Sequence, residues 1–253
     1  MCYNSYIVRN RKKQNKMKGR IERPEATKPR LVLPRVGKIR IGVKNAKGYP
    51  QSLDYFIATG KYAGLFLQAY GEKPQIIQIV FPDDDPEKVC CERYEYRDDE
   101  GNLVACGDGC NFDVWNPKTK RYESFSAKDY PQIMQSIQNR YPTKLSQKTG
   151  DGWRVRLTLN FIIPLVRGVA GIWTFETNGN ASTIPQIRET FDCMLLERGF
   201  CKGIIFDLAV QFAVSQKPGV NSRYPVVSLI PNESADNVLK VKKAYEPIME
   251  VKK

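Results

Sequence analysis

The order of strand-like and helix-like segments in residues 153–231 restricts the fold of this chain more than any other feature of its sequence. Two long strand patterns, WRVRLTLNFII and RGVAGIWTFETN, flank Pro164, and a helical pattern, STIPQIRETFDCMLLERGF, follows them. Two further strand patterns, IIFDLAVQFAVSQ and YPVVSLIP, complete the segment. Strands and helices therefore do not alternate strictly along the chain. This order predicts an α+β fold, mostly antiparallel β-sheet with a few packed helices.

The helical pattern of residues 182–200 has a start signal and one apolar face. Ser182 or Thr183 is the expected N-cap, and Pro185 lies in the first turn. The apolar residues that recur at helical spacing, and that we expect to be buried, are Ile184, Ile187, Phe191, Met194 and Leu195.

The first half of the chain contains shorter elements of both kinds. GKIRIGVK alternates Ile and Val with Lys and Arg, which predicts a half-buried strand with one basic face. KYAGLFLQAYG predicts a short helix that ends at Gly71, and QIIQIVF predicts the next strand. The residues around RDDEG predict a hairpin that turns at Asp98–Gly101, with Arg93 opposite Cys106.

The segments that follow predict a turn at NPKTKR, a return strand at YESF and a helix in SAKDYPQIMQSIQNRY with Asp129 as its N-cap. LSQKTGDG reads as a polar loop and as the best internal boundary. We expect four segments: a basic flexible arm (1–30), an N-terminal α+β half (31–145), a C-terminal β-β-α-β-β half (151–231) and a polar tail (232–253). Alternatively, the two halves form one domain.

Positive charge is concentrated at the N-terminus. Residues 1–30 contain ten Lys or Arg and two acidic residues, a net charge of +8 out of +13 for the whole chain. A basic arm on a folded body is common in nucleic-acid-binding proteins, because each cation that neutralises a phosphate releases a counterion. Two alternatives are a solubilising tail and an upstream extension of residues 1–16, with the natural start at Met17.

Histidine is absent, so the chain lacks the commonest general base and the commonest metal ligand. We therefore expect a binding protein rather than an enzyme, with no cofactor. Seven cysteines without regular spacing favour a reducing cytoplasm over a disulfide scaffold. No run of about 18 apolar residues predicts a membrane span.

The stretch LVACGDGCNFDVW invites three interpretations. Cys90, Cys91, Cys106 and Cys110 lie near one another on the predicted hairpin and are weak candidates for a zinc site. Neighbouring strand residues point to opposite faces, however, so Cys90 and Cys91 do not suit one ion. A phosphate-binding loop would need a helix after GDG, whereas a strand is predicted there. We therefore expect a turn in which Asp108 binds its own backbone, with no bound metal.

Basic and aromatic residues in the arm and the first strand region are the candidates for contact with nucleic acid or a protein partner. Single-stranded nucleic acid binds where bases stack on rings and phosphates face cations. Alternatively, the rings of Phe56, Tyr62 and Phe66 belong to the core. The candidates are Arg9, Arg11, Lys12, Lys13, Lys16, Lys18, Arg35, Lys38, Arg40, Lys44, Lys47, Tyr55 and Lys61.

Several long motifs occur in a familiar order: LPRVGKIRIGVK, YPQSLDYFIATGKYAGLFLQAYGEKPQIIQIVFPDD, CERYEYRDDEGNLVACGDG, FIIPLVRGVAGIWTFETNGNASTIPQIRETFD and SQKPGVNSRYPVVSLIP. From about Leu33 to Pro231 the chain resembles the recombination directionality factor-like family of phages and integrative elements. The resemblance carries over no catalytic motif.

The resemblance implies an accessory protein that contacts the coiled-coil region of a large serine integrase and biases that integrase toward prophage excision. The implied partners are the integrase and DNA, bound directly or through the integrase. Neither a membrane nor a small-molecule substrate is implied, and the implied location is the cytoplasm of a bacterial host cell. The alternatives are a single-stranded DNA-binding or annealing accessory protein of phage or mobile-element replication and, third, a metal-dependent nuclease.

Overall fold

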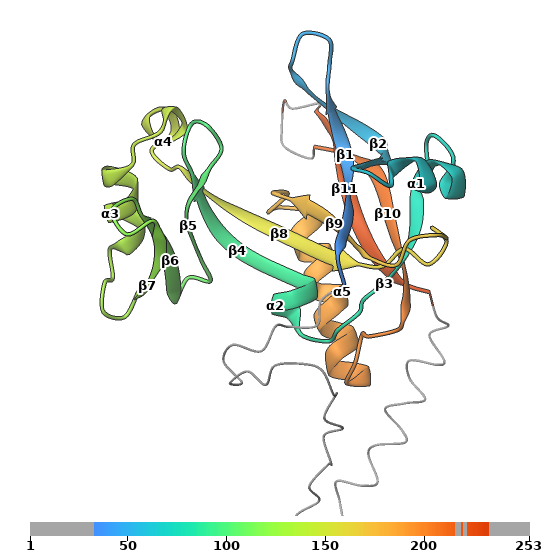
Figure 1. Ribbon diagram of the computed structural model, residues 1–253. Helices are drawn as coiled ribbons and strands as arrows, with labels where there is room; N and C mark the ends of the chain where they lie inside the picture. The colour runs from blue at the N-terminus through green and yellow to red at the C-terminus, as the bar shows by residue number, and fades with distance from the viewer. Residues whose placement is uncertain (1–32, 216–218, 220–221, 233–253) are drawn as a thin grey trace, which may run out of the picture. The chain divides into compact units, whose positions relative to one another are not determined.

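Most of the alternating apolar segments form strands in the computed structural model, which describes residues 33–215, 219 and 222–232 (Figure 1). The strands are β1 Arg35–Lys44, β2 Pro50–Thr59, β3 Ile76–Val80, β4 Cys90–Arg97, β5 Leu103–Gly107, β6 Asn111–Asn116, β7 Arg121–Ser126, β8 Trp153–Phe161, β9 Ile172–Thr177, β10 Ile205–Val214 and β11 Arg223–Pro231. The helices are α1 Ala63–Tyr70, α2 Pro86–Val89, α3 Ile133–Arg140, α4 Lys144–Thr149 and α5 Thr183–Arg198. None of these described helices is both long and apolar enough to cross a membrane.

The larger sheet has eight strands in the order β2-β1-β9-β8-β4-β5-β6-β7. Every neighbouring pair is antiparallel except β1 and β9, so the predicted α+β fold with mostly antiparallel sheet is confirmed. Strands from both halves of the chain alternate in this sheet, because β9 and β8 lie between β1 and β4. Gly37 on β1 lets the two parallel strands approach, since a Cβ atom there would lie 2.5 Å from the Trp173 ring on β9.

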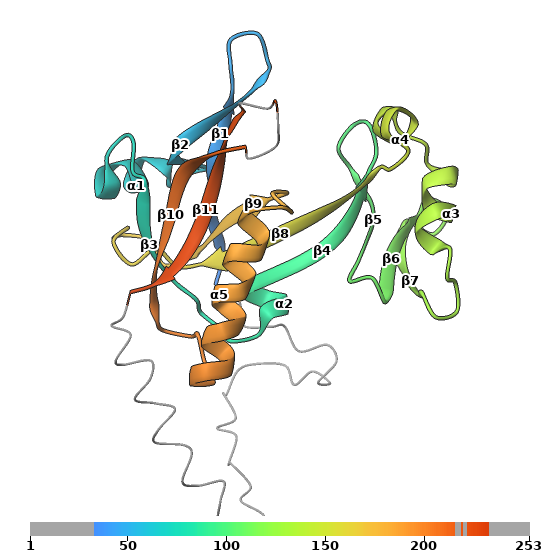
Figure 2. The ribbon, with the colours of Figure 1, turned by 180° about the vertical axis from the view of Figure 1, so that it is seen from behind.

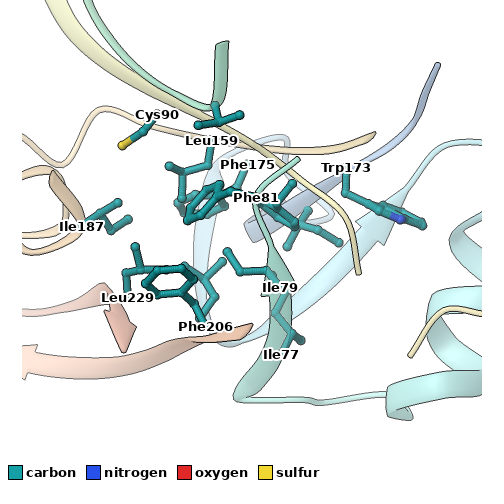
Figure 3. Packing of buried hydrophobic residues seen from close by; sticks show 14 of the residues in the cluster. Ile77, Ile79, Phe81, Cys90, Leu159, Trp173, Phe175, Ile187, Phe206 and Leu229 are labelled. Atoms are coloured by element: carbon teal, nitrogen blue, oxygen red, sulfur yellow. The ribbon is translucent and has the colours of Figure 1, made fainter. Parts of the chain in front are cut away.

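The smaller sheet has three strands in the order β11-β10-β3, and it joins the larger sheet through a bridge between Val80 and Ile162. The two sheets, α1 and α5 enclose one cluster of buried apolar residues, the main core (Figure 3). Its members include Ile77, Ile79, Phe81, Cys90, Leu159, Trp173, Phe175, Ile187, Phe206 and Leu229.

Helix α5 buries the face that its sequence predicts. Its buried residues are Thr183, Ile184, Ile187, Phe191 and Met194. Ser182 occupies the N-cap position without a side-chain hydrogen bond. The hydroxyl of Thr183 instead accepts the backbone N–H of Val227 at 3.1 Å, which ties the start of α5 to β11.

A second cluster of buried residues lies against the β4–β7 part of the large sheet. It comprises Tyr96, Val104, Ala105, Phe112, Val114, Ile133, Ile137 and Trp153. Helix α3 contributes Ile133 and Ile137, and β8 contributes Trp153. Two buried rings also bind backbone: Tyr96 Oη donates to the carbonyl of Tyr141 at 2.6 Å, and Trp153 Nε1 donates to that of Met134 at 3.1 Å.

Two predicted elements of this region were wrong. Helix α3 begins at Ile133 with Gln132 at the N-cap position, whereas Asp129 belongs to a preceding turn in which Tyr130 N–H binds the carbonyl of Ser126. Pro131 explains the delay, because a proline disfavours helical backbone at the residue before it.

The polar segment LSQKTGDG is not a loop, because most of it belongs to α4. Thr143 and Ser146 form a reciprocal capping box at the start of this helix, and Gly150 ends it in the left-handed conformation. The capping signal was visible in the sequence, but the helix is too short for an apolar period to reveal it.

Candidate interaction surface

The first strand turns its cations toward the outer face of the large sheet. Ile39 is buried in the main core, so its neighbours Lys38 and Arg40 point the other way. Lys38 pairs with Thr174 of β9 in the parallel register, and Glu176 follows on the same face. Strand β8 adds Arg156 to this face. The basic face predicted for GKIRIGVK is thus extended by residues far away in the sequence.

Two hollows of about 580 and 610 Å³ open on this face, on either side of Lys38 and Thr174, which line both. We call the pair of hollows the basic groove. Its charged lining consists of Arg35, Lys38, Arg40, Lys61, Arg156 and Glu176. Five cations thus share the lining with one carboxylate, an arrangement that attracts anions.

Ion pairs occupy part of this charge. Glu176 accepts from Lys38 Nζ at 3.1 Å and from Arg156 at 3.0 Å, and Arg156 Nε also lies 2.7 Å from Glu95 of β4. Burial acts to raise the pKa of Glu176, but the hydrogen bond from Lys38 and the nearby cations outweigh burial, so its pKa is lowered. Glu176 therefore stays ionised, and Arg35, Arg40 and Lys61 are the groove cations without an ion pair among the described residues.

Beyond the groove, β1 and β2 continue into a hairpin tip, Val43–Gln51, in which every side chain is exposed. Asn45 orders the turn, because its Oδ1 accepts the backbone N–H groups of Lys47 at 3.0 Å and Tyr49 at 2.9 Å. Gly48 adopts a φ of 81°, which favours glycine. Lys44, Lys47 and the 66% exposed Tyr49 are the large side chains of this ordered turn.

The structure brings several predicted contact residues together and separates others. Arg35, Lys38, Arg40 and Lys61 line the basic groove, and Lys44 and Lys47 lie on the hairpin tip. Tyr55 lines neither hollow, and its ring faces Lys73, whose Nζ is 5.8 Å from the ring centroid. The candidates of the arm, Arg9, Arg11, Lys12, Lys13, Lys16 and Lys18, lie outside the described residues.

The aromatic residues of this region divide between core and surface. Phe56 and Phe66 are buried in the main core. Tyr62 is half-buried and lines the groove, with Lys61 Nζ 5.6 Å from its ring centroid. The sequence analysis missed Arg156 and Glu176. The alternation in WRVRLTLN indicated a basic face for β8, but nothing local placed it beside β9 and β1.

The four cysteines do not converge on one point. Cys90 is buried in the main core, Cys91 and Cys106 are half-buried, and Cys110 is exposed. Arg93 hydrogen-bonds the thiols of both Cys91 and Cys106. Burial raises the pKa of Cys90, Cys91 and Cys106, so these thiols favour their protonated form. Among the residues that the structure describes, no group of three or more Cys, Asp or Glu is arranged to hold a metal ion.

The predicted register of the β4–β5 hairpin was wrong. Cys106 pairs with Glu95 rather than Arg93, because the ladder shifts between Tyr96 and Arg97. Such a bulge places an extra residue in one strand and moves every later pair. Arg93 still reaches Cys106 because diagonal neighbours on one face lie within the range of a long side chain.

The ACGDGC stretch forms the predicted turn, between β5 and β6. Asp108 Oδ1 accepts the backbone N–H groups of Asn111 at 2.7 Å and Cys110 at 2.8 Å, and Gly109 has a φ of 96°. These bonds lower the pKa of Asp108, because they favour the ionised carboxylate. The carboxylate therefore serves the turn.

The acidic run Asp83–Asp85 is also tied to backbone. Asp84 Oδ1 accepts the N–H groups of Cys201 at 2.7 Å and Lys202 at 2.6 Å, and Asp85 caps α2. These carboxylates therefore hold loops and helix ends together.

The comparisons with known proteins give one match. A family model described as recombination directionality factor-like matches residues 36–232. This range includes both sheets, the hairpin tip and all of the basic groove except Arg35. No curated protein and no solved structure matches the chain.

Proposed function

Because the chain belongs to the recombination directionality factor-like family, we propose that it binds a large serine integrase on DNA and biases it toward excision. The proposed contact on the integrase is its coiled-coil region, and the chain performs no chemistry of its own. The observation that carries the proposal is the family match, which extends over residues 36–232 and so over both sheets.

The proposed mechanism is a population shift. An integrase bound to DNA can pair its coiled coils in two geometries, and a protein that contacts one of them more tightly favours that one by its differential affinity. A shift from about 1:99 to 99:1 requires roughly 5.5 kcal/mol of differential binding. One modest protein interface can supply a difference of this size.

The surface of the protein supports a binding role. The outer face of the large sheet presents cations in the basic groove, and the hairpin tip presents ordered, exposed side chains. The absence of histidine favours binding over general acid–base catalysis.

A recombination assay with purified components tests the proposal. We expect the protein to raise integrase recombination between attL and attR and to lower recombination between attP and attB. A matched reaction with heat-denatured protein controls for carry-over from the preparation. Unchanged attL × attR activity with integrases from the same mobile element would contradict the proposal.

The second candidate function is a single-stranded DNA-binding or annealing accessory protein. The presence of Tyr62 beside Lys61 in the basic groove favours it, because single strands bind where rings and cations alternate. Under this function, oligonucleotide binding weakens with salt and persists after removal of residues 1–30. Loss of all binding with those residues would assign the activity to the arm instead.

A further inference from the structure

The hairpin tip has a shape and charge that suit duplex DNA. We propose that it enters the major groove, with Lys44 and Lys47 on the phosphates beside that groove and Arg40 on the phosphate backbone at the base of the hairpin. This inference rests on the proposed function and deepens it, because it makes DNA a direct partner of this chain rather than one reached only through the integrase.

The first step of the argument is shape. The tip is a two-stranded antiparallel ribbon in which Val43 pairs with Gln51 and Lys44 with Pro50. Such a ribbon fits the major groove of B-DNA, which is about 12 Å wide and about 8.5 Å deep. From Gly42 to Asn45 the strand advances three residues, or about 10 Å at the usual rise per residue. The free part of the ribbon therefore matches the depth of the groove.

The second step is exposure. Figures 1 and 2 both show the β1–β2 hairpin extending past the other strands. Tyr49 is 66% exposed and Val43 is 37% exposed, so neither apolar side chain contributes to a core. In a DNA groove, these groups can contact thymine methyl groups and base edges, which gives their exposure a use.

The third step is charge. Residues 33–53 contain five Lys or Arg and no Asp or Glu. Lys38 is neutralised by Glu176 at 3.1 Å, which leaves Arg35, Arg40, Lys44 and Lys47 without an ion pair among the described residues. A cation without a local partner can neutralise a phosphate and release a counterion at little cost.

The fourth step is the contrast with the outer side of α5. A hollow there is lined by Glu92, Glu189, Asp192 and Glu197, with Arg188 as the cation among them. This acidic side repels phosphates, whereas the hairpin attracts them. The charge distribution thus orients the protein on DNA with the hairpin toward the duplex and leaves the α5 side for another partner.

The turn is preorganised for this contact. The two hydrogen bonds to Asn45 Oδ1 and the backbone bond from Asn45 N–H to the carbonyl of Tyr49 at 2.8 Å fix its conformation in the free protein. Binding therefore orders little further backbone, which limits the entropic cost.

Duplex binding by the full chain tests the inference. We expect the double variant Lys44→Gln/Lys47→Gln to bind a fluorescent duplex about tenfold more weakly, and its salt dependence to fall by about two phosphate contacts, at ~0.9 per contact in the slope. The matched control is Lys118→Gln/Lys120→Gln, which removes two lysines from the β6–β7 turn. The control should bind like the wild type, and circular dichroism should show all three proteins folded.

Two further readouts separate this inference from the proposed function. Dimethyl sulfate modifies guanine N7 in the major groove, so the wild type should protect guanines that the Lys44/Lys47 variant does not. Integrase capture by the variant should equal that of the wild type. Loss of integrase capture with intact duplex binding would assign the tip to the protein partner and overturn the inference, as would equal duplex binding by both variants. Loss of duplex binding by a chain that never captures an integrase would refute the proposed function and leave the inference standing.

Discussion

The main core is enclosed by two sheets and two helices, whereas the second cluster is covered by the β4–β7 part of one sheet and α3. The main core contains only apolar side chains and thiols, such as Phe81, Phe206 and Cys90. The second cluster depends on Tyr96 and Trp153, whose polar atoms bind the carbonyls of Tyr141 and Met134.

This difference shows how a small cluster is made specific. A large core excludes water on every side, and apolar burial at about 25 cal/mol per Å² dominates its stability. A cluster with fewer members gains less from burial, so hydrogen bonds from buried rings fix the position of α3 on the sheet. Replacements in the two regions should therefore differ in size and in extent.

The largest effect is expected from Phe206→Ala in the main core. Phe206 is fully buried and packs edge-to-face on Phe81 with ring centroids 5.3 Å apart. We expect the free energy of unfolding to fall by about 3–5 kcal/mol, from lost burial and the cavity left behind. Urea unfolding followed by circular dichroism measures this loss. A decrease below about 1 kcal/mol would mean that the main core repacks easily.

A smaller and more local effect is expected from Trp153→Phe in the second cluster. The change removes the 3.1 Å hydrogen bond to Met134 and leaves a carbonyl without its partner, at a cost of about 1–3 kcal/mol. Hydrogen exchange should accelerate in α3 and remain unchanged in β10. Equal acceleration in both elements would show that the two clusters unfold as one unit.

The capping box of α4 should contribute less again. Thr143→Ala removes the side-chain oxygen that accepts Ser146 N–H at 3.0 Å, which should cost about 1 kcal/mol. Ser136→Ala on the exposed face of α3 is the control and should leave stability unchanged. If both variants unfold at the wild-type urea concentration, α4 contributes nothing to the second cluster.

The smallest expected effect concerns the β5–β6 turn and appears only with pH. The pKa of Asp108 is lowered in the folded protein by the N–H groups of Asn111 and Cys110. A lowered folded pKa gives stability that is complete above the unfolded pKa of about 3.9 and is lost as pH falls through the folded pKa. Asp108→Asn should therefore reduce stability at pH 7 and make it less sensitive to acid.

A comparison of urea midpoints at pH 7 and pH 3 measures this effect. Asp129→Asn is the control, because the described residues donate no hydrogen bond to the Asp129 side chain. An equal loss of acid sensitivity in both variants would mean that the turn bonds of Asp108 do not set its pKa.

Local patterns were sufficient to predict many elements. The alternation in GKIRIGVK predicted β1 and its basic outer face, and helical spacing predicted the buried face of α5. Asp and Gly in ACGDGC predicted the turn at Asp108. In each case, one short segment contains both the signal and the structure.

The exact partners of these segments could not be predicted in the same way. Nothing in β1 indicates that it runs parallel to β9, more than 130 residues later, or that Lys38 meets Glu176 there. The β4–β5 register shifted because a bulge between Tyr96 and Arg97 is set by packing across the sheet.

The sequence by itself determined which segments are strands, which helix face is apolar and where cations concentrate, because periodicity and charge are local properties of the chain. The tertiary structure alone decided that residues from β1, β8, β9 and the segment after β2 form one groove, and that the β1–β2 tip stays free of the core. Strand pairing depends on which apolar faces can be buried together across the whole domain, and that competition has no signature in any single segment.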